Sequence, residues 1–167
     1  MTFSKRVLFF AIGFLLLGTD RAAAAFAVEL SPAYFSDQSV STSEIAQTYL
    51  YSQFAGYISV DSKKRLFVGW DYLLVNHTVA GSTNTVFATT DMGPAVMYMP
   101  SSKRPIVLGA AFHIQSQAAL QSTSTVAWNG TGYVVSVAYA PDFNSKLNIG
   151  VALNYWSASY TRETTAS

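Results

Sequence analysis

Cysteine is absent from this 167-residue sequence, which excludes disulfide bridges, thiolate metal ligands and a lipid-modified cysteine anchor. Charged residues are scarce, at 11% of the chain against roughly 25% in typical soluble domains. From Val28 onward, no segment approaches the roughly 18 to 20 unbroken apolar residues that a membrane-spanning helix requires. If this part of the chain enters a bilayer, it must therefore do so as β-strands.

Apolar and aromatic residues are abundant instead. Half of the residues are hydrophobic, and ten Tyr and eleven Phe contribute to an aromatic share of 14%. The length suits one domain and is too short for two ordinary ones. Such a composition indicates that something other than water covers part of the surface.

The N-terminus has the three regions of a secretory signal peptide. Lys5 and Arg6 precede an apolar run at residues 7–17, and small residues follow, ending in Ala25-Phe26-Ala27. We expect cleavage after Ala27, with Ala25 as an alternative, so that residues 1–27 are the signal peptide and residues 28–167 the mature domain. An uncleaved membrane anchor is the competing interpretation.

Export would leave the mature domain close to neutral. The ten basic and nine acidic side chains of the whole chain become seven and eight once Lys5, Arg6, Arg21 and Asp20 are removed. A domain with this balance gives no electrostatic basis for binding nucleic acid.

The mature part has the pattern of short strands. Segments rich in Val, Tyr, Phe, Thr and Trp alternate with clusters of Gly, Ser, Asn, Asp and Pro. The predicted strands are residues 28–36, 47–60, 65–76, 85–99, 106–118, 128–140 and 146–160. Short charged connections at 61–64, 101–105 and 142–145 alternate with longer Ser- and Thr-rich ones at 37–46, 77–84 and 119–126. Short turns at one end and longer loops at the other are typical of transmembrane barrels.

Residues along these strands separate into a bulky and a small face. In the third segment Leu66, Val68, Trp70, Tyr72 and Leu74 share one face, and Phe67, Gly69, Asp71, Leu73 and Val75 share the other. In the last two segments the second face holds mostly Gly, Ala, Ser and Asn with few charges, which favours a narrow barrel with large residues toward lipid. The second segment is ambiguous, since either its Tyr residues or Leu50, Phe54 and Ile58 could face outward.

Three tyrosines repeat at a constant spacing. Tyr57, Tyr98 and Tyr139 each precede a short turn and differ by 41 positions both times. A tyrosine at a membrane interface buries its ring and keeps its hydroxyl in water. The spacing predicts that the three belong to an aromatic girdle at one height of the barrel. Ordinary strand tyrosines in a soluble sandwich are the competing interpretation.

The signal peptide, the loop alternation and strands such as Phe67-Val68-Gly69-Trp70-Asp71-Tyr72 and Asp91-Met92-Gly93-Pro94-Ala95-Val96 resemble the small, eight-stranded outer-membrane β-barrel family of bacteria. The resemblance covers the mature chain. It implies an all-β, antiparallel, up-and-down transmembrane barrel in the cell outer membrane, with lipid and the barrel-assembly machinery as partners.

The chain departs from that family at its end. Seven of the expected eight strands are visible, and the 41-residue rhythm would place a Tyr that ends an eighth strand near position 180. The sequence ends in polar residues instead of a terminal aromatic strand. We hypothesise a shortened or incomplete product, or a second copy that completes the barrel as a homo-oligomer.

Three titratable residues are predicted to meet on the small face. With turn centres near Gly81 and Ser102, antiparallel pairing places Asp71 opposite Asp91 and Asp91 opposite His113. A shared proton, or a protonated His113, would relieve the repulsion between the carboxylates. This lumen polar cluster is a candidate proton or cation site, and a structural network that fills the lumen is the more conservative interpretation.

No catalytic motif, cofactor or metal site is recognisable. A lipid hydrolase or acyltransferase of barrel form would need His77 with a nucleophile such as Ser82, but that loop contains no acid partner. We expect a structural or surface-interaction protein with no enzymatic activity, and not an open pore, since an eight-stranded interior is filled by side chains. The alternative is a soluble periplasmic β-barrel that binds an apolar ligand.

Overall fold

The computed structural model describes residues 2–18, 26–39, 45–80, 85–100, 106–121, 125–144 and 147–162. The described residues are all-β, and none of them forms a helix that could cross a membrane. The strands are β1 (Thr2–Gly18), β2 (Phe26–Ser39), β3 (Ile45–Ser59), β4 (Leu66–Val79), β5 (Thr85–Tyr98), β6 (Ile106–Gln121), β7 (Thr125–Tyr139), β8 (Asp142–Asn144) and β9 (Leu147–Arg162).

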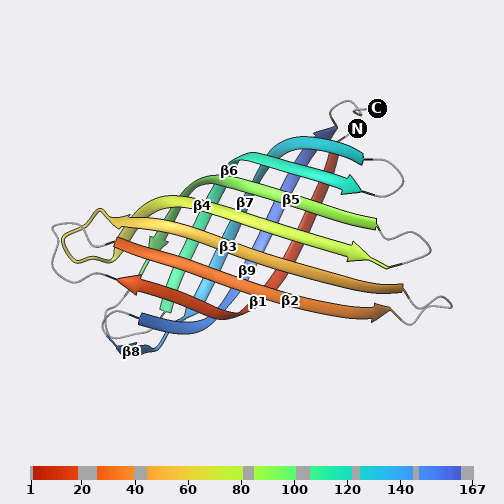
Figure 1. Ribbon diagram of the computed structural model, residues 1–167. Coiled ribbons are helices and arrows are strands. Elements are labelled where there is room, and N and C mark those ends of the chain that lie inside the picture. Colours follow the sequence, from red (N-terminus) through yellow and green to blue (C-terminus); the bar gives the residue numbers. More distant parts are fainter. Residues whose placement is uncertain are drawn as a thin grey trace.

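Seven long strands follow one another up and down in a strongly curled sheet (Figure 1). Their order is β2-β3-β4-β5-β6-β7-β9, and every neighbouring pair is antiparallel. Each corresponds to one of the seven predicted segments, so the all-β, antiparallel, up-and-down prediction is confirmed. The short strand β8 lies where a turn was predicted and pairs with the start of β9.

Residues 2–18, predicted to belong to the signal peptide, lie in the sheet as β1. This strand pairs with β9 from Thr2↔Thr161 to Leu17↔Leu147. Its pairing with β2 is confined to the rungs from Leu15↔Leu30 to Gly18↔Ala27. The strand β1 therefore occupies the place of an eighth strand, and cleavage after Ala27 remains a prediction.

The short turn between β3 and β4 is held by Asp61. Its carboxylate Oδ1 accepts hydrogen bonds from the backbone N–H groups of Arg65 and Leu66, each at 2.7 Å. Lys64 has a positive φ of 52°, which lets the chain reverse within this turn. These bonds hold the pKa of the Asp61 carboxyl below its ordinary value, the bond from Leu66 most of all.

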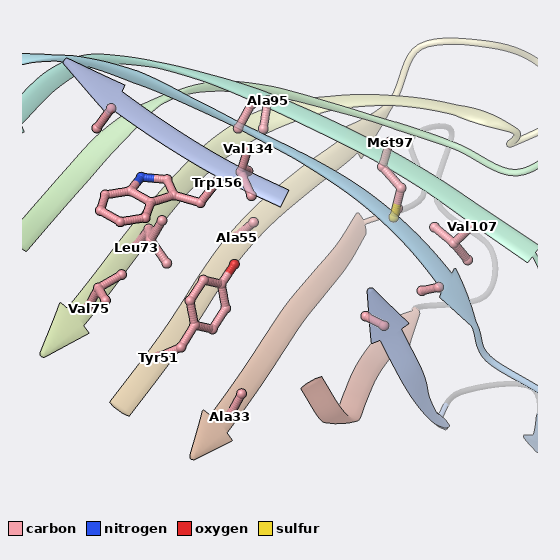
Figure 2. Packing of buried hydrophobic residues seen from close by; sticks show 14 of the residues in the cluster. Ala33, Tyr51, Ala55, Leu73, Val75, Ala95, Met97, Val107, Val134 and Trp156 are labelled. Atoms are coloured by element: carbon pink, nitrogen blue, oxygen red, sulfur yellow. The ribbon is translucent and has the colours of Figure 1, made fainter. Parts of the chain in front are cut away.

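Exposure alternates along the strands, and bulky apolar residues lie on the outer face. Trp70, Phe112 and Val137 are 49%, 53% and 51% exposed. On the inner face Leu73 and Trp156 are buried and point into the space that the sheet encloses (Figure 2). The ambiguous second segment turns Phe54 outward and its neighbours Gln53 and Ala55 inward.

Candidate functional site

Polar side chains from five strands gather on the inner face. We call the following residues the polar cluster: Tyr51 and Gln53 of β3, Asp71 of β4, Asp91 of β5, His113 of β6, and Trp156 and Tyr160 of β9. Each is at most 2% exposed. Alternation along a strand puts every second residue on this face, so these residues reach the interior without any break in the strands.

Asp71 is bound from two sides. His113 Nε2 lies 2.8 Å from Asp71 Oδ2, so an imidazole N–H at that position donates to the carboxylate. Gln53 Nε2 donates to the other oxygen, Oδ1, at 2.7 Å. The Tyr51 hydroxyl donates in turn to Gln53 Oε1 at 2.6 Å. This chain of donors fixes the orientation of the buried Asp71 carboxylate.

Asp91 has a separate set of donors. Trp156 Nε1 donates to Asp91 Oδ2 at 2.7 Å, and the Tyr160 hydroxyl lies 3.4 Å from Oδ1. His113 Nδ1 lies 4.0 Å from Asp91 Oδ2, which is too long for a hydrogen bond but short for a charge interaction. A protonated His113 would therefore attract both carboxylates at once.

A third carboxylate lies on the same face, on β2. Glu29 is 2% exposed, and its carboxylate accepts hydrogen bonds from Tyr57 at 3.0 Å and Ser31 at 3.4 Å. Sequence reasoning did not single out Glu29, although the alternation of Ala27, Glu29, Ser31 and Ala33 could have placed it inward. The inner face thus contains three described carboxylates that accept hydrogen bonds from uncharged side chains, and one of them, Asp71, also contacts His113.

Gly93 makes the contact between Asp71 and His113 geometrically feasible. It lies on β5, directly opposite Asp71 on β4. A Cβ atom on Gly93 would collide with the carbonyl oxygen of Phe112 and would lie 2.9 Å from His113 Cα. Because Gly93 has no side chain, β5 and β6 approach closely here, and the imidazole reaches Asp71 two strands away.

The predicted register of these residues was wrong, although the three side chains meet. Asp71 lies opposite Gly93, not Asp91, and Asp91 lies opposite Ser116, not His113. Both turn centres lie one residue later than predicted, and the register shift between Met92 and Ala95 displaces the partner of Asp91 by one further residue. The length of the imidazole side chain compensates for the displacement.

The predicted tyrosine girdle is wrong for Tyr57. Tyr98 and Tyr139 are 42% and 53% exposed on the outer face, but Tyr57 is 3% exposed on the inner face. The outer face of β3 is taken by Leu50, Phe54 and Ile58, and the Tyr57 hydroxyl finds its partner in Glu29. A constant spacing along the chain therefore did not place the three rings on one face.

His77 lies near the loop end of the inner face, where it contacts Tyr49 and Gln47. Its ring stacks on Tyr49 with a centroid distance of 4.1 Å, and its Nε2 lies 3.2 Å from Gln47 Oε1. Ser82 lies outside the described residues. The contacts of His77 that are described are those of a packed rim residue.

Within the polar cluster, one ring nitrogen of His113 contacts the Asp71 carboxylate and the other lies 4.0 Å from the Asp91 carboxylate. Within the described part of the chain, no group of three His, Asp or Glu side chains is arranged to hold a metal ion. The assignment of Asp71, Asp91 and His113 as a proton or cation site stays a prediction.

Comparisons with protein-family models, with curated proteins and with solved structures found no match for this chain.

Proposed function

We propose that this chain is an exported bacterial outer-membrane β-barrel protein with a structural or surface-interaction role. Its outer face would contact lipid, and its Ser- and Thr-rich connections would face outward from the cell. The resemblance to small outer-membrane barrels, the signal-like N-terminus and the arrangement of the two faces support this proposal. Neither a cofactor nor catalysis is part of it.

The observation that carries the proposal is the apolar outer face. Large hydrophobic residues at least 36% exposed occur on every long strand from β2 to β9, including Leu30, Phe54, Trp70, Val96, Phe112, Val135 and Leu153. A shallow apolar depression of about 330 Å³ on the same face is lined by Pro94, Val96, Phe112, Tyr133 and neighbouring residues. Soluble monomers rarely expose contiguous apolar surface beyond a few hundred Å². A surface of this kind suits a hydrocarbon environment.

The interior argues against both an open pore and an apolar ligand. Tyr51, Leu73, Met97 and Trp156 are at most 1% exposed, so side chains fill the space between the curled strands. Asp71, Asp91 and His113 lie among them without any exposure. An apolar ligand placed there would displace hydrogen-bonded carboxylates, which is unfavourable.

Fractionation of expressing cells tests the proposal. The full chain is produced in a Gram-negative host, and the outer-membrane fraction is run on a detergent gel with and without boiling. We expect the protein in this fraction, with a migration that changes on heating, because a hydrogen-bonded barrel resists the detergent until it is heated. Carbonate extraction of the same membranes provides the control against peripheral attachment.

Release by osmotic shock, in the soluble periplasmic fraction, would contradict the proposal and favour the soluble barrel. Recovery in the membrane with a hydrolase or acyltransferase activity that is lost in His77→Ala would keep the location and overturn the non-enzymatic role.

A further inference from the structure

The two outermost strands of the seven-stranded sheet run in the same direction. With β2 to β7 and β9 antiparallel to each neighbour, β2 and β9 both start at the short-turn end and finish at the long-loop end. They therefore cannot pair with each other in the antiparallel way. A second copy inserted in the same direction would also bring β9 against a parallel β2. We call the junction between the edges of β2 and β9 the seam. Antiparallel closure of the seam requires one additional strand that runs in the opposite direction.

The strand β1 has the required direction, but its pairing with β9 is much longer than its pairing with β2. It pairs with β9 along nearly its whole length and with β2 only between Leu15 and Gly18. In the described ladders, β2 beyond Leu30 pairs with β3 alone. Residues 2–18 also belong to the segment that the proposed export would remove. Without β1, no other described strand pairs with the free edges of β2 and β9, and unpaired edges are costly in lipid.

Asn154 indicates which kind of side chain a strand in the seam should place opposite it. It is fully buried on the inner face of β9, and neither its Nδ2 nor its Oδ1 has a hydrogen-bond partner among the described residues. Its cross-strand neighbours are Ser136 on β7 and Phe9 on β1. An unsatisfied buried amide is destabilising, so a neighbouring strand with a hydrogen-bonding side chain at this position would stabilise β9.

The neighbouring positions of β9 specify the rest of the pattern. Ile149, Val151 and Leu153 are 50%, 37% and 46% exposed on the outer face, whereas Ala152 and Asn154 are buried on the inner face. A strand that suits both the lipid and the interior must alternate in the same way. It needs apolar residues opposite the outer positions and a hydrogen-bonding side chain opposite Asn154.

We propose that the seam between β2 and β9 binds an extended, amphipathic peptide strand that lies antiparallel to both edges and places a polar side chain opposite Asn154. This inference rests on the proposed function, because residues 1–27 must leave the seam on export. Recognition is by strand addition: main-chain hydrogen bonds supply the affinity, and the Asn154 position supplies the selectivity. Residues 2–18 are then a temporary occupant.

Intact mass of the outer-membrane protein is the first measurement. We expect the mass of a chain that begins after the signal peptide. If the protein resides in the outer membrane and still carries residues 2–18, this inference is overturned and the proposed function stands. If the protein is absent from the outer membrane, the proposed function fails before the seam is tested.

Peptide capture is the second measurement. The chain has no cysteine, so Ser159→Cys introduces a single reactive site on the outer face of β9. Two synthetic 15-residue peptides with the alternating pattern carry Cys at the position that faces residue 159, where Ser4 lies opposite Ser159. One has Asn at the position opposite Asn154 and the other has Val. Each is added while the processed chain is refolded from urea into detergent micelles.

We expect the Asn peptide to form the disulfide-linked complex at about ten-fold lower concentration than the Val peptide, since only the Asn peptide can form a buried hydrogen bond with Asn154. In the matched variant Asn154→Val this preference should disappear or reverse, because the lone amide is gone. Equal capture of both peptides, a preference unchanged in Asn154→Val, or capture of neither peptide would each overturn the inference.

Discussion

At the scale of single residues, Gly93 supports the polar cluster, because its missing side chain lets β5 and β6 approach closely beside His113. In Gly93→Ala the new methyl group would collide with the Phe112 carbonyl and crowd His113 Cα, which lies 2.9 Å from the added Cβ. The strands must separate there, and overpacking of this kind typically costs about 1 to 3 kcal/mol. We expect a lower urea midpoint for the variant refolded in micelles, with Asp71 and His113 no longer bonded.

Gly56→Ala provides the matched control. Gly56 also lies within a long strand, but the nearest atom to an added Cβ is Phe26 Cζ at 3.9 Å, an ordinary van der Waals contact. Its urea midpoint should stay close to that of the unmodified chain. Equal effects of the two substitutions would show that a general strand preference against glycine, and not the contact at Gly93, controls stability.

His113 is the second residue-scale prediction. In His113→Leu the buried Asp71 loses its imidazole partner at 2.8 Å and keeps only the hydrogen bond from Gln53, and Asp91 loses the ring nitrogen at 4.0 Å. Loss of one member of a buried pair typically costs about 3 to 5 kcal/mol. We expect this range for the free energy of unfolding in micelles.

A double-mutant cycle isolates the pair. In the background of His113→Leu, the substitution Asp71→Asn removes the buried carboxyl group that has lost its imidazole partner and should recover part of the lost stability. Each single substitution should therefore lower the free energy of unfolding more in the unmodified chain than in the chain that already carries the other substitution. Strictly additive effects would mean that the imidazole and the carboxylate do not interact, whatever their distance.

At the scale of elements, the turn between β3 and β4 should respond to acid. The pKa of Asp61 lies below its ordinary value of 3.8 because the carboxylate accepts backbone hydrogen bonds from Leu66 and Arg65. A lowered pKa in the folded state means that ionised Asp61 stabilises the turn above the ordinary value. This contribution is lost as the pH falls through the lowered, folded-state pKa.

Amide hydrogen exchange of Arg65 and Leu66 measures this effect. At neutral pH, Asp61→Ala should exchange these amides faster than the unmodified chain. At pH values well below 3.8 the difference between the two proteins should vanish, because the carboxyl is then protonated in both states. Persistence of the full difference in acid would show that the turn depends on the aspartate for reasons other than its charge.

The elements themselves were predictable from the sequence, and their relative positions less so. Alternation such as that in residues 66–75 identifies a half-buried strand, and each predicted segment from residue 28 onward overlaps one long strand. Register depends on turn geometry, which composition does not specify, so Asp71 was paired two residues away from its actual partner Gly93. Tyr57 was misplaced because both faces of its segment are apolar.

The polar cluster was partly predictable for the same reasons. Asp71, Asp91 and His113 stand out because charge is rare on these strands. Trp156 and Tyr160 could not be linked to Asp91, since they lie 65 and 69 residues away and belong to a strand that is not its sheet neighbour. Contacts across the enclosed space depend on how far the sheet curls, and no local pattern encodes that curvature.

At the scale of the whole molecule, the exposed outer face is unusually apolar for a protein surrounded by water. Val135 illustrates this, since it is 46% exposed near the middle of β7 and is flanked by Ala110 and Tyr155 on the neighbouring strands. In water, a charge at such a position would be nearly neutral, within about 0.5 kcal/mol. On a lipid-facing strand near the bilayer midplane, an arginine costs about 2 to 4 kcal/mol.

Val135→Arg therefore discriminates between the two environments, and Val60→Arg is its control. Val60 is 53% exposed but follows the end of β3 at the turn, where an interfacial arginine would cost about 0 to 1 kcal/mol. Both variants are unfolded by urea after refolding into phospholipid vesicles. A markedly larger loss of stability for Val135→Arg supports a bilayer around the strands. Equal and small losses would place the outer face in water, and the exposed apolar surface would then need a protein partner.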